Sequence, residues 1–364
     1  MSLSHLLFAI AFCVAVFIAN AYIYRRLFAL IFPKYKRFFL GLCVVLFVSN
    51  VVFLFSMRAN FLPDIIYMVL SALLGFSFFF FLIAIFYDIL KLISAKTIKG
   101  NFNEQRRKTL KLICDIGILF IAFGCFLQGI YRAIRIPPIK YVDINAGLGV
   151  KIAMISDVHL GKNLHEDFLK ELIAKINAQD VDFIVIVGDL IDTNIDEITY
   201  LDLLNTFNKP CYYVTGNHEY YHDATKILEK LRQTNIKVLE NESIDLGKIV
   251  LSGVNDLRGA KYGMPMDLAP IFKSYKEEKY NILLAHQPVV AKKFDLSKFD
   301  LVLSGHTHAG QIFPFSILVL MQQGFLHGLY EIGKKTKLYV SSGAGFWGPS
   351  IRFLAPSEIA IIKL

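Results

Sequence analysis

The stretch Leu303-Ser304-Gly305-His306-Thr307-His308-Ala309-Gly310-Gln311 decides the fold of the second half of this chain. It continues an apolar run, from Phe299 to Leu303, that predicts a buried strand. In an extended segment residues i and i+2 point the same way, so both imidazoles can reach one cavity. Because a single His-x-His pair is common, its meaning depends on what the segments upstream supply.

Four upstream segments have the same form, with a polar side chain just after an apolar strand. They are Ile155-Ser156-Asp157-Val158-His159, Val187-Gly188-Asp189, Thr215-Gly216-Asn217-His218-Glu219 and Leu284-Ala285-His286-Gln287-Pro288. In open α/β sheets, sites form in the crevice beyond the carboxyl ends of the strands. All five segments together offer carboxylate, carboxamide and imidazole groups without a thiolate, a set that suits Mn, Fe or Zn.

The number of these groups predicts a site for two divalent metal ions, with Mn as the first choice. The seven candidate ligands are Asp157, His159, Asp189, Asn217, His286, His306 and His308. Two cations about 3.5–4 Å apart can clamp a phosphoryl oxygen and acidify a water molecule. His218 lies beside a candidate ligand but exceeds the count, so it can contact the phosphate and protonate the leaving oxygen.

The order of motifs D-x-H, GD, GNH(D/E), H and GHxH resembles the calcineurin-like metallophosphoesterases over about residues 150–364. Segments 157–161, 305–311, 328–330 and 338–341 are similar to the membrane-associated bacterial YkuE and YaeI type, and also to transmembrane phosphoesterase-domain proteins. The resemblance implies a four-layer α/β/β/α sandwich of two mixed sheets. It also implies one metal on Asp157, His159 and His308, a second on Asn217, His286 and His306, a bridging Asp189 and a general acid, His218.

The sequence departs from the family pattern at a few positions. Glu219 stands where Asp is commoner, and Ala309 stands where Gly is commoner. Ser342 stands where this branch often has Arg, so one basic contact to substrate is in doubt, and Arg352 is a candidate to replace it.

The first 135 residues have the composition of a membrane region. Their apolar runs predict four transmembrane helices, at about residues 3–24, 38–57, 65–87 and 112–131. Residues 136–149 are predicted to be a linker, and residues 150–364 the phosphoesterase domain. Lys and Arg outnumber Asp and Glu by 15 to 4 in residues 1–135, but the numbers are 24 and 26 in the remainder. The pI near 9.1 therefore does not describe a basic globular surface, and nucleic acid is not expected as a partner.

The distribution of loop charge predicts the orientation in the membrane. The loops after the first and third helices contain 12 Lys and Arg, against 4 on the opposite side. Positively charged loops tend to stay in the cytoplasm. The chain is therefore expected to be a multi-pass protein of a bacterial inner membrane, with its phosphoesterase domain outside the cytoplasm.

These features predict a membrane-anchored phosphoesterase that uses metal-activated water on a phosphoester, including a phosphodiester, or on a pyrophosphate. A lipid or lipid-linked substrate is favoured. One alternative is a UDP-diacylglucosamine-type pyrophosphatase, which requires the domain on the cytoplasmic face. Another is a membrane sensor or transporter whose phosphoesterase-like domain only binds ligand, although a degenerate domain tends to lose metal ligands. The sequence leaves the oligomeric state open.

The apolar run Ile312–Met321 follows the candidate metal ligands directly. It predicts either a buried strand or helix, or an apolar rim beside the metals that dips toward the bilayer and receives a lipid chain. Phe325, Phe346 and Trp347 are candidates to extend such a rim.

Overall fold

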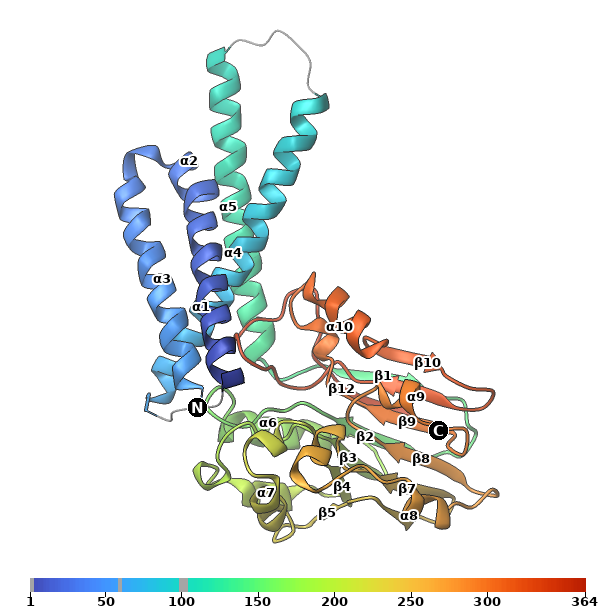
Figure 1. The fold of residues 1–364 in the computed structure, drawn as a ribbon. Coiled ribbons are helices and arrows are strands. Elements are labelled where there is room, and N and C mark those ends of the chain that lie inside the picture. Colours follow the sequence, from blue (N-terminus) through green and yellow to red (C-terminus); the bar gives the residue numbers. More distant parts are fainter. Residues whose placement is uncertain (1–2, 58–60, 98–103) are drawn as a thin grey trace. The chain divides into compact units, whose positions relative to one another are not determined.

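The computed structural model describes residues 3–57, 61–97 and 104–364 (Figure 1). The chain divides into two compact units, Met1–Tyr131 with Gly348–Ile351, and Arg132–Trp347 with Arg352–Leu364. The first unit is helical, and the second contains both sheets. Arg58 and Lys99, which contribute to the predicted orientation, lie outside the described residues.

Four long helices begin the chain, and they agree with the four predicted from its apolar runs. They are α1 (Leu3–Ile23), α3 (Lys36–Ser56), α4 (Asp64–Thr97) and α5 (Glu104–Ile134), with a short α2 (Ala29–Ile31) between the first two. The segments long and apolar enough to cross a membrane are Leu6–Ile31, Pro33–Ser56, Asp64–Ile93 and Lys108–Ile134. The helices indicate a membrane protein.

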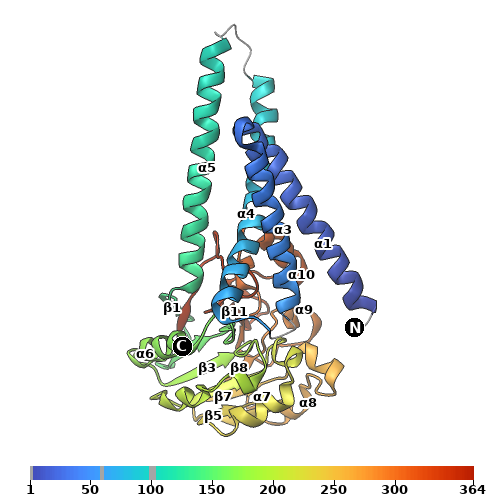
Figure 2. The ribbon, with the colours of Figure 1, turned by 90° about the vertical axis from the view of Figure 1, so that its left-hand side faces the viewer.

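Helices α1, α3 and α4 pack against one another (Figure 2), and buried polar side chains join them. The Asn50 side-chain amide donates a hydrogen bond to Ser77 Oγ at 2.8 Å, and Ser77 Oγ donates to Asn20 Oδ1 at 3.3 Å. In lipid, such bonds can hold helices together where hydrophobic burial cannot. This chain of hydrogen bonds therefore gives the three helices a specific register.

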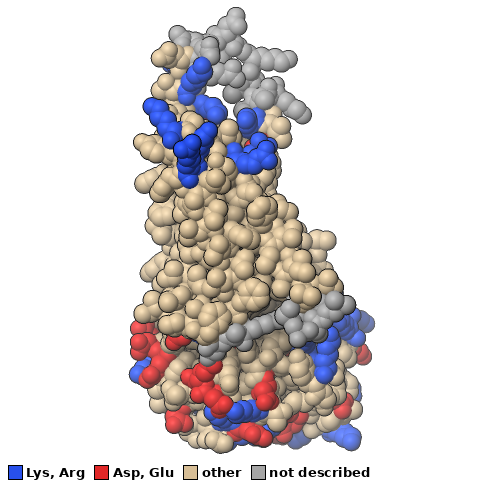
Figure 3. Space-filling view, turned by 60° about the vertical axis from the view of Figure 1, so that its left-hand side comes forward, with Lys and Arg blue, Asp and Glu red and all other residues tan. Residues whose placement is uncertain are grey.

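Most described Lys and Arg residues of the helical unit lie near one end of its helices, whereas Asp64 begins α4 at the other end. Figure 3 shows Lys and Arg gathered there, beyond a surface without charge. Asp115 of α5 is 5% exposed; it accepts a hydrogen bond from the Tyr87 hydroxyl at 3.0 Å and lies 3.4 Å from Lys111 Nζ. Asp115 thus pairs within the protein, as buried charges in membrane helices generally do.

The second unit contains two six-stranded mixed sheets. The first has the order β1 (Ile139–Asp143), β12 (Ile359–Lys363), β2 (Lys151–Ile155), β3 (Phe183–Val187), β4 (Cys211–Val214) and β5 (Ile236–Val238). The second has the order β10 (Gly328–Glu331), β11 (Lys337–Val340), β9 (Leu301–Ser304), β8 (Tyr280–Leu284), β7 (Ile249–Gly253) and β6 (Glu242–Asp245). Four neighbouring strands run parallel in each sheet. These are β2, β3, β4 and β5 in the first sheet, and β11, β9, β8 and β7 in the second.

Alternation along the strands explains why the sheets face each other. In β2, Ile152 and Met154 belong to the core between the sheets, whereas Ala153 and Ile155 face the core under the helices. Helices α6 (Glu166–Asn177) and α7 (Ala224–Leu231) cover the outer face of the first sheet. The shorter α8 (Ala269–Lys273) and α9 (Val290–Lys293) cover the second. The predicted α/β/β/α sandwich is confirmed.

Three segments differ from what their sequence suggests. The predicted linker 136–149 contributes β1, which pairs in parallel with β12 at the edge of the first sheet. The sequence over 197–207 predicts a helix, whereas the structure has two 3-10 helices there, Ile195–Glu197 and Leu201–Thr206. The apolar run after the metal motif forms α10 (Phe315–Gln323).

Candidate metal centre

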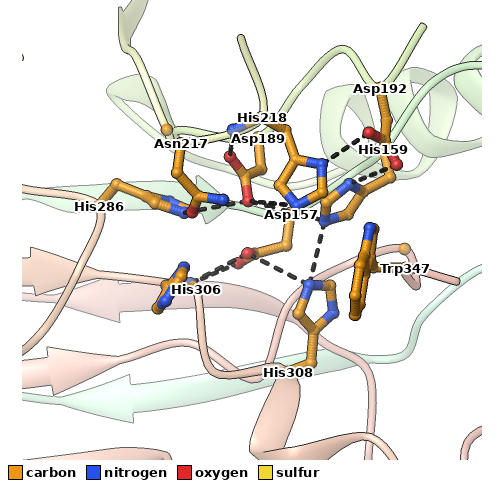
Figure 4. Close-up of polar contacts among 12 residues, drawn as sticks. Asp157, His159, Asp189, Asp192, Asn217, His218, His286, His306, His308 and Trp347 are labelled. Carbon is orange, nitrogen blue, oxygen red and sulfur yellow. Dashed lines mark hydrogen bonds and ion pairs between the residues drawn. The ribbon is translucent and has the colours of Figure 1, made fainter. Parts of the chain in front are cut away.

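The candidate metal centre lies at the carboxyl ends of five parallel strands (Figure 4). In the first sheet, β2 is followed by Asp157 and His159, β3 by Asp189, and β4 by Asn217 and His218. In the second sheet, β8 is followed by His286, and β9 by His306 and His308. The structure therefore brings all seven predicted ligands and His218 together. Each group of ligands described below draws side chains from both sheets.

One group consists of Asp157, His159 and His308, whose ligand atoms lie within 4.8 Å of one another. The Nε2 atoms of the two histidines are 3.0 Å apart, and His308 Nε2 is 3.5 Å from Asp157 Oδ1. Atoms that share an ion at about 2.0–2.2 Å lie roughly 3–3.5 Å apart, so the separations fit a common metal. Three donors of this kind fit a divalent cation.

The second group consists of Asp189, His286 and His306. His286 Nε2 lies 3.1 Å from Asp189 Oδ2 and 3.2 Å from Asn217 Oδ1. The other ring nitrogen of His286 is 2.9 Å from the carbonyl of Val187, which keeps a proton there and leaves Nε2 free for a metal. These contacts also fit a divalent cation.

Asp189 stands between the two groups. Its Oδ2 atom is 3.1 Å from His286 Nε2 on one side and 3.8 Å from His159 Nε2 on the other. Its Oδ1 atom instead accepts a hydrogen bond from the backbone N–H of His218 at 2.8 Å. A single oxygen, Oδ2, therefore faces both groups.

Burial fixes the protonation of the two histidines of the opening motif. Burial lowers the pKa of His306 to about 3. Burial, aided by His159 and Arg352, also holds the pKa of His308 well below its ordinary value. Both imidazoles are therefore neutral at physiological pH, which is the form that binds metals.

Five of the seven predicted ligands have a backbone conformation that is rare outside glycine. Their φ angles lie between +49° and +70°, at Asp157, His159, Asp189, His306 and His308. Such conformations cost about 1–3 kcal/mol each and persist only where the surroundings impose them. Here hydrogen bonds between neighbouring loops impose them; the N–H groups of Asp157 and His159 donate to the carbonyls of Gly188 and Asp189, each at 3.0 Å.

Two glycines of the motifs leave room for ligands from other strands. A Cβ atom on Gly216 would lie 2.1 Å from Asp189 Oδ1, and one on Gly305 would lie 2.4 Å from Asp157 Oδ2. Any larger residue would displace the neighbouring carboxylate. Gly216 of GNH and Gly305 of GHxH are therefore required for steric reasons, because the carboxylates of Asp189 and Asp157, respectively, pack against them.

Glu219 is a supporting residue that its motif did not reveal. Its carboxylate is fully buried and accepts hydrogen bonds from four backbone N–H groups. These belong to Gly216, Asp189, Leu190 and Ile191, at 2.7–3.1 Å. The carboxylate therefore fastens the loop after β3 to the loop after β4, which holds Asp189 and Asn217 in register.

Asp192 is a second residue that sequence reasoning missed. Its Oδ1 atom lies 2.6 Å from His218 Nδ1 and 3.2 Å from His222 Nε2, and its Oδ2 lies 3.3 Å from His159 Nδ1. Burial would raise the pKa of Asp192, but the charge of His218 and the imidazole hydrogen bonds hold it well below its ordinary value. A second carboxylate three residues after Asp189 was the available signal.

Asp192 in turn controls the protonation of His218. Burial opposes the charged imidazole, but Asp192 and Asp189 outweigh it and raise the pKa of His218 to about 9. His218 Nδ1 faces Asp192, and Nε2 lies 4.0 Å from Asp189 Oδ2 on the side of the ligands. A protonated Nε2 can therefore serve a reacting group at the centre.

Arg352 does not face the site, contrary to its suggested role as a substrate contact. Its side chain is fully buried. The guanidinium donates to the carbonyls of Ser342, Gly345, Pro356 and His308, at 2.6–3.3 Å, and Nη2 lies 3.1 Å from His308 Nδ1. Arg352 is therefore a support for the loops behind His308, with no donor left for a phosphate.

This architecture defines a class: an α/β domain with two adjoining candidate sites for divalent cations at its strand ends. A sequence model of the calcineurin-like phosphoesterases matches residues 150–310. A metallophosphoesterase of Campylobacter jejuni is 46% identical over 357 residues, which cover 95% of each chain.

Two further relatives contain the same domain. A transmembrane protein with metallophosphoesterase domain from Danio rerio is 33% identical over 68% of this chain and 61% of that protein. The metallophosphoesterase YkuE of Bacillus subtilis is 33% identical over 59% of this chain and 79% of its own length. The chain belongs to the calcineurin-like metallophosphoesterases, which use a dinuclear metal site, and it is a metal-dependent phosphoesterase.

Proposed function

We propose that this phosphoesterase is anchored by its four helices and hydrolyses a phosphoester or pyrophosphate of a lipid or lipid-linked substrate. One observation carries the lipid part: α10 begins seven positions after His308 and exposes its apolar side chains. Phe313, Phe315, Ile317, Leu318, Leu320 and Met321 are between 45% and 76% exposed. No charged residue occurs between Leu301 and Tyr330. The expectation of a buried segment is wrong, and an apolar rim beside the metals is favoured.

The rim is smaller than its sequence suggested. Trp347 is 44% exposed and can contribute, whereas Phe346 is 2% exposed and belongs to the core. A continuous apolar surface of this kind on a soluble protein usually marks an interaction site. In a chain with four membrane-spanning helices, lipid is the partner that such a surface suits.

Chain connectivity also supports a membrane-bound substrate. The last candidate span ends at Ile134, and β1 begins at Ile139. The four residues between them reach about 14 Å at most. A phosphoesterase unit on so short a tether remains close to the bilayer, where lipid headgroups are concentrated.

The proposed chemistry assigns a role to each group of side chains. Asp157, His159 and His308 would hold one ion. Asn217, His286 and His306 would hold the other ion, and Asp189 would bind both. Mn is the first candidate for these ions. Such ions activate water and neutralise phosphoryl oxygens. His218, held by Asp192, would donate its Nε2 proton to the leaving oxygen.

The double substitution Leu318→Ser with Leu320→Ser tests the lipid proposal. Each leucine buried against an acyl chain contributes about 1.5–3 kcal/mol. We therefore expect kcat/KM for phosphatidic acid in mixed micelles to fall at least tenfold. Hydrolysis of the soluble ester bis(4-nitrophenyl) phosphate should stay unchanged, both being measured with purified protein and added Mn.

The control is Tyr141→Ser, which removes a 62% exposed ring from β1 of the first sheet. It should leave both activities unchanged. An equal loss on the lipid and soluble substrates in the α10 variant would mean damage to the domain, and the lipid proposal would then fail.

We also propose that the phosphoesterase unit lies outside the cytoplasm of a bacterial inner membrane, as loop charge indicates. A C-terminal alkaline phosphatase fusion should then be active in cells, and a green fluorescent protein fusion should be dark. The reverse pattern would contradict this orientation and favour a cytoplasmic nucleotide-lipid pyrophosphatase.

A further inference from the structure

The segment Gly348–Ile351, here called the bridging segment, belongs to the helical unit, although the residues on both sides of it belong to the phosphoesterase unit. Within it, Ser350 and Ile351 are 4% and 0% exposed. The bridging segment packs against α4, which is long and apolar enough to cross a membrane. The chain therefore joins its two units here as well as after α5.

One side chain of α4, that of Ser71, holds the bridging segment. Ser71 is fully buried, and its hydroxyl donates a hydrogen bond to the carbonyl of Gly348 at 2.8 Å. The same oxygen accepts a hydrogen bond from the Ser350 N–H at 2.9 Å and lies 2.7 Å from Ser350 Oγ, which donates the third bond. A serine hydroxyl has one donor and two acceptor positions, and Ser71 uses all of them on this segment. Ser71 therefore fixes the backbone of the segment as well as a side chain.

Gly75, one turn further along α4, gives the bridging segment the space to approach. A Cβ atom on Gly75 would lie 3.0 Å from Ile351 Cγ2 and 3.5 Å from Pro349 Cβ. Small residues on membrane helices allow close approach of this kind. The hydrogen bonds of Ser71 and the contact at Gly75 together give the segment one defined position along α4.

Both neighbours of the bridging segment are bonded to the loop that contains His308. On one side, the Trp347 N–H donates to the Gln311 side chain at 3.0 Å, and Gln311 donates to the Trp347 carbonyl at 2.7 Å. On the other side, Arg352 donates to the carbonyl of His308 at 3.3 Å, and its guanidinium lies 3.1 Å from the imidazole Nδ1. A contiguous set of hydrogen bonds and peptide bonds of this kind can transmit a displacement. It runs from α4 to a candidate metal ligand.

We propose that Ser71 of the helical unit is a positioning residue for the metal centre. Through the bridging segment it fixes Trp347 and Arg352, which in turn hold the loop of His308. The packing of a membrane helix then sets the affinity for the ion that His308 would bind. The inference rests on the proposed function, in which His308 is a metal ligand. Removing a residue that orients a metal ligand typically lowers metal affinity or activity about 10–100-fold, and a smaller loss is expected for Ser71, which acts through a further residue.

Ser71→Ala removes all three hydrogen bonds and tests the proposal in the full-length protein, held in phosphatidylcholine nanodiscs. The measurement is calorimetric titration with manganese chloride. We expect the affinity for one of two Mn ions to fall about three- to tenfold, the size of effect that the net loss of a hydrogen bond produces, with the affinity for the other ion unchanged. In His308→Ala, which should lose the affected ion, Ser71→Ala should have no further effect on Mn affinity.

A second measurement reports on the bridging segment itself. Trp347 is the only tryptophan of the chain and directly precedes the segment. With chelator present, Ser71→Ala should shift the Trp347 emission to longer wavelength and increase its quenching by acrylamide, because the segment is no longer held. Ser350→Ala removes one of the same bonds and should produce a smaller change. The double variant should match Ser71→Ala alone, because the two substitutions remove a shared interaction and their effects do not add.

Ser77→Ala is the matched control, since Ser77 is also buried in α4 and its hydrogen bonds are to Asn50 and Asn20. It should leave both Mn affinities and the Trp347 emission unchanged. Equal losses in Ser77→Ala, or unchanged Mn affinities in Ser71→Ala, would overturn the role of Ser71 and leave the metal centre standing. Failure of the unmodified protein to bind two Mn ions would refute the metal centre, and this inference with it.

Discussion

Asp189→Asn is expected to abolish metal-stimulated phosphoester hydrolysis. Its carboxylate Oδ2 faces both candidate metal groups, at 3.1 Å from His286 Nε2 and 3.8 Å from His159 Nε2. Burial opposes its charge, but His286 and His218 hold its pKa well below the ordinary range, so the oxygen is anionic at neutral pH. A neutral carboxamide is a poor bridge between two cations. Loss of several kcal/mol of transition-state stabilisation corresponds to a fall in kcat of about a thousandfold or more.

The measurement is kcat with added Mn, together with the Mn bound per protein chain. His306→Ala should produce a comparable loss, because it removes an imidazole of the second group. Asp180→Asn is the matched control, since this carboxylate is 89% exposed and pairs with Lys151 at the surface. Rates like those of the unmodified protein for Asp189→Asn would refute the assignment of the centre.

The second large loss of activity is expected when His218 is substituted, and the size of this loss should depend on the leaving group of the substrate. General acid catalysis contributes about 10²–10⁴-fold, and only where the leaving oxygen is basic. For His218→Asn we therefore expect such a loss on an alkyl phosphoester and a loss below tenfold on a 4-nitrophenyl ester. An equal loss on both would indicate a role in metal or phosphate binding instead.

The pH profile gives an independent readout of the same residue. A general acid must be protonated, so activity should fall as pH rises through the pKa of His218, which is about 9. Bound cations would lower this value. Asp192→Asn removes the partner that raises the pKa most, so the alkaline limb should move to lower pH. If the alkaline limb of the pH profile does not move in Asp192→Asn, the proposed pairing of Asp192 with His218 is contradicted.

Much of the fold was predictable because its signals are local. The apolar runs predicted four long helices, and the motifs at strand ends predicted the α/β/β/α sandwich and the family, and all of these are confirmed. The metal ligands and the role of His218 stay predictions, although the structure brings these side chains together. Manganese and the lipid substrate also stay predictions.

The remaining features depend on contacts between distant segments. Glu219 reads as a conservative exchange in its motif, but it accepts four backbone hydrogen bonds from two loops. The sequence indicates Arg352 as a possible substrate contact, but in the fold its side chain is buried and donates a hydrogen bond to the carbonyl of His308. For the run at Ile312, hydrophobicity alone does not distinguish a buried helix from an exposed one, because both require apolar residues.

The division of ligands between the two sheets has a mechanical consequence. Asp157 and His159 follow a strand of one sheet, and His308 follows a strand of the other. An ion held by all three would be a cross-link between the halves of the sandwich that forms only in the folded protein. Metal binding that occurs only in the folded state adds to folding stability. The supply of metal would then set the lifetime of this domain in the cell as well as its rate of turnover.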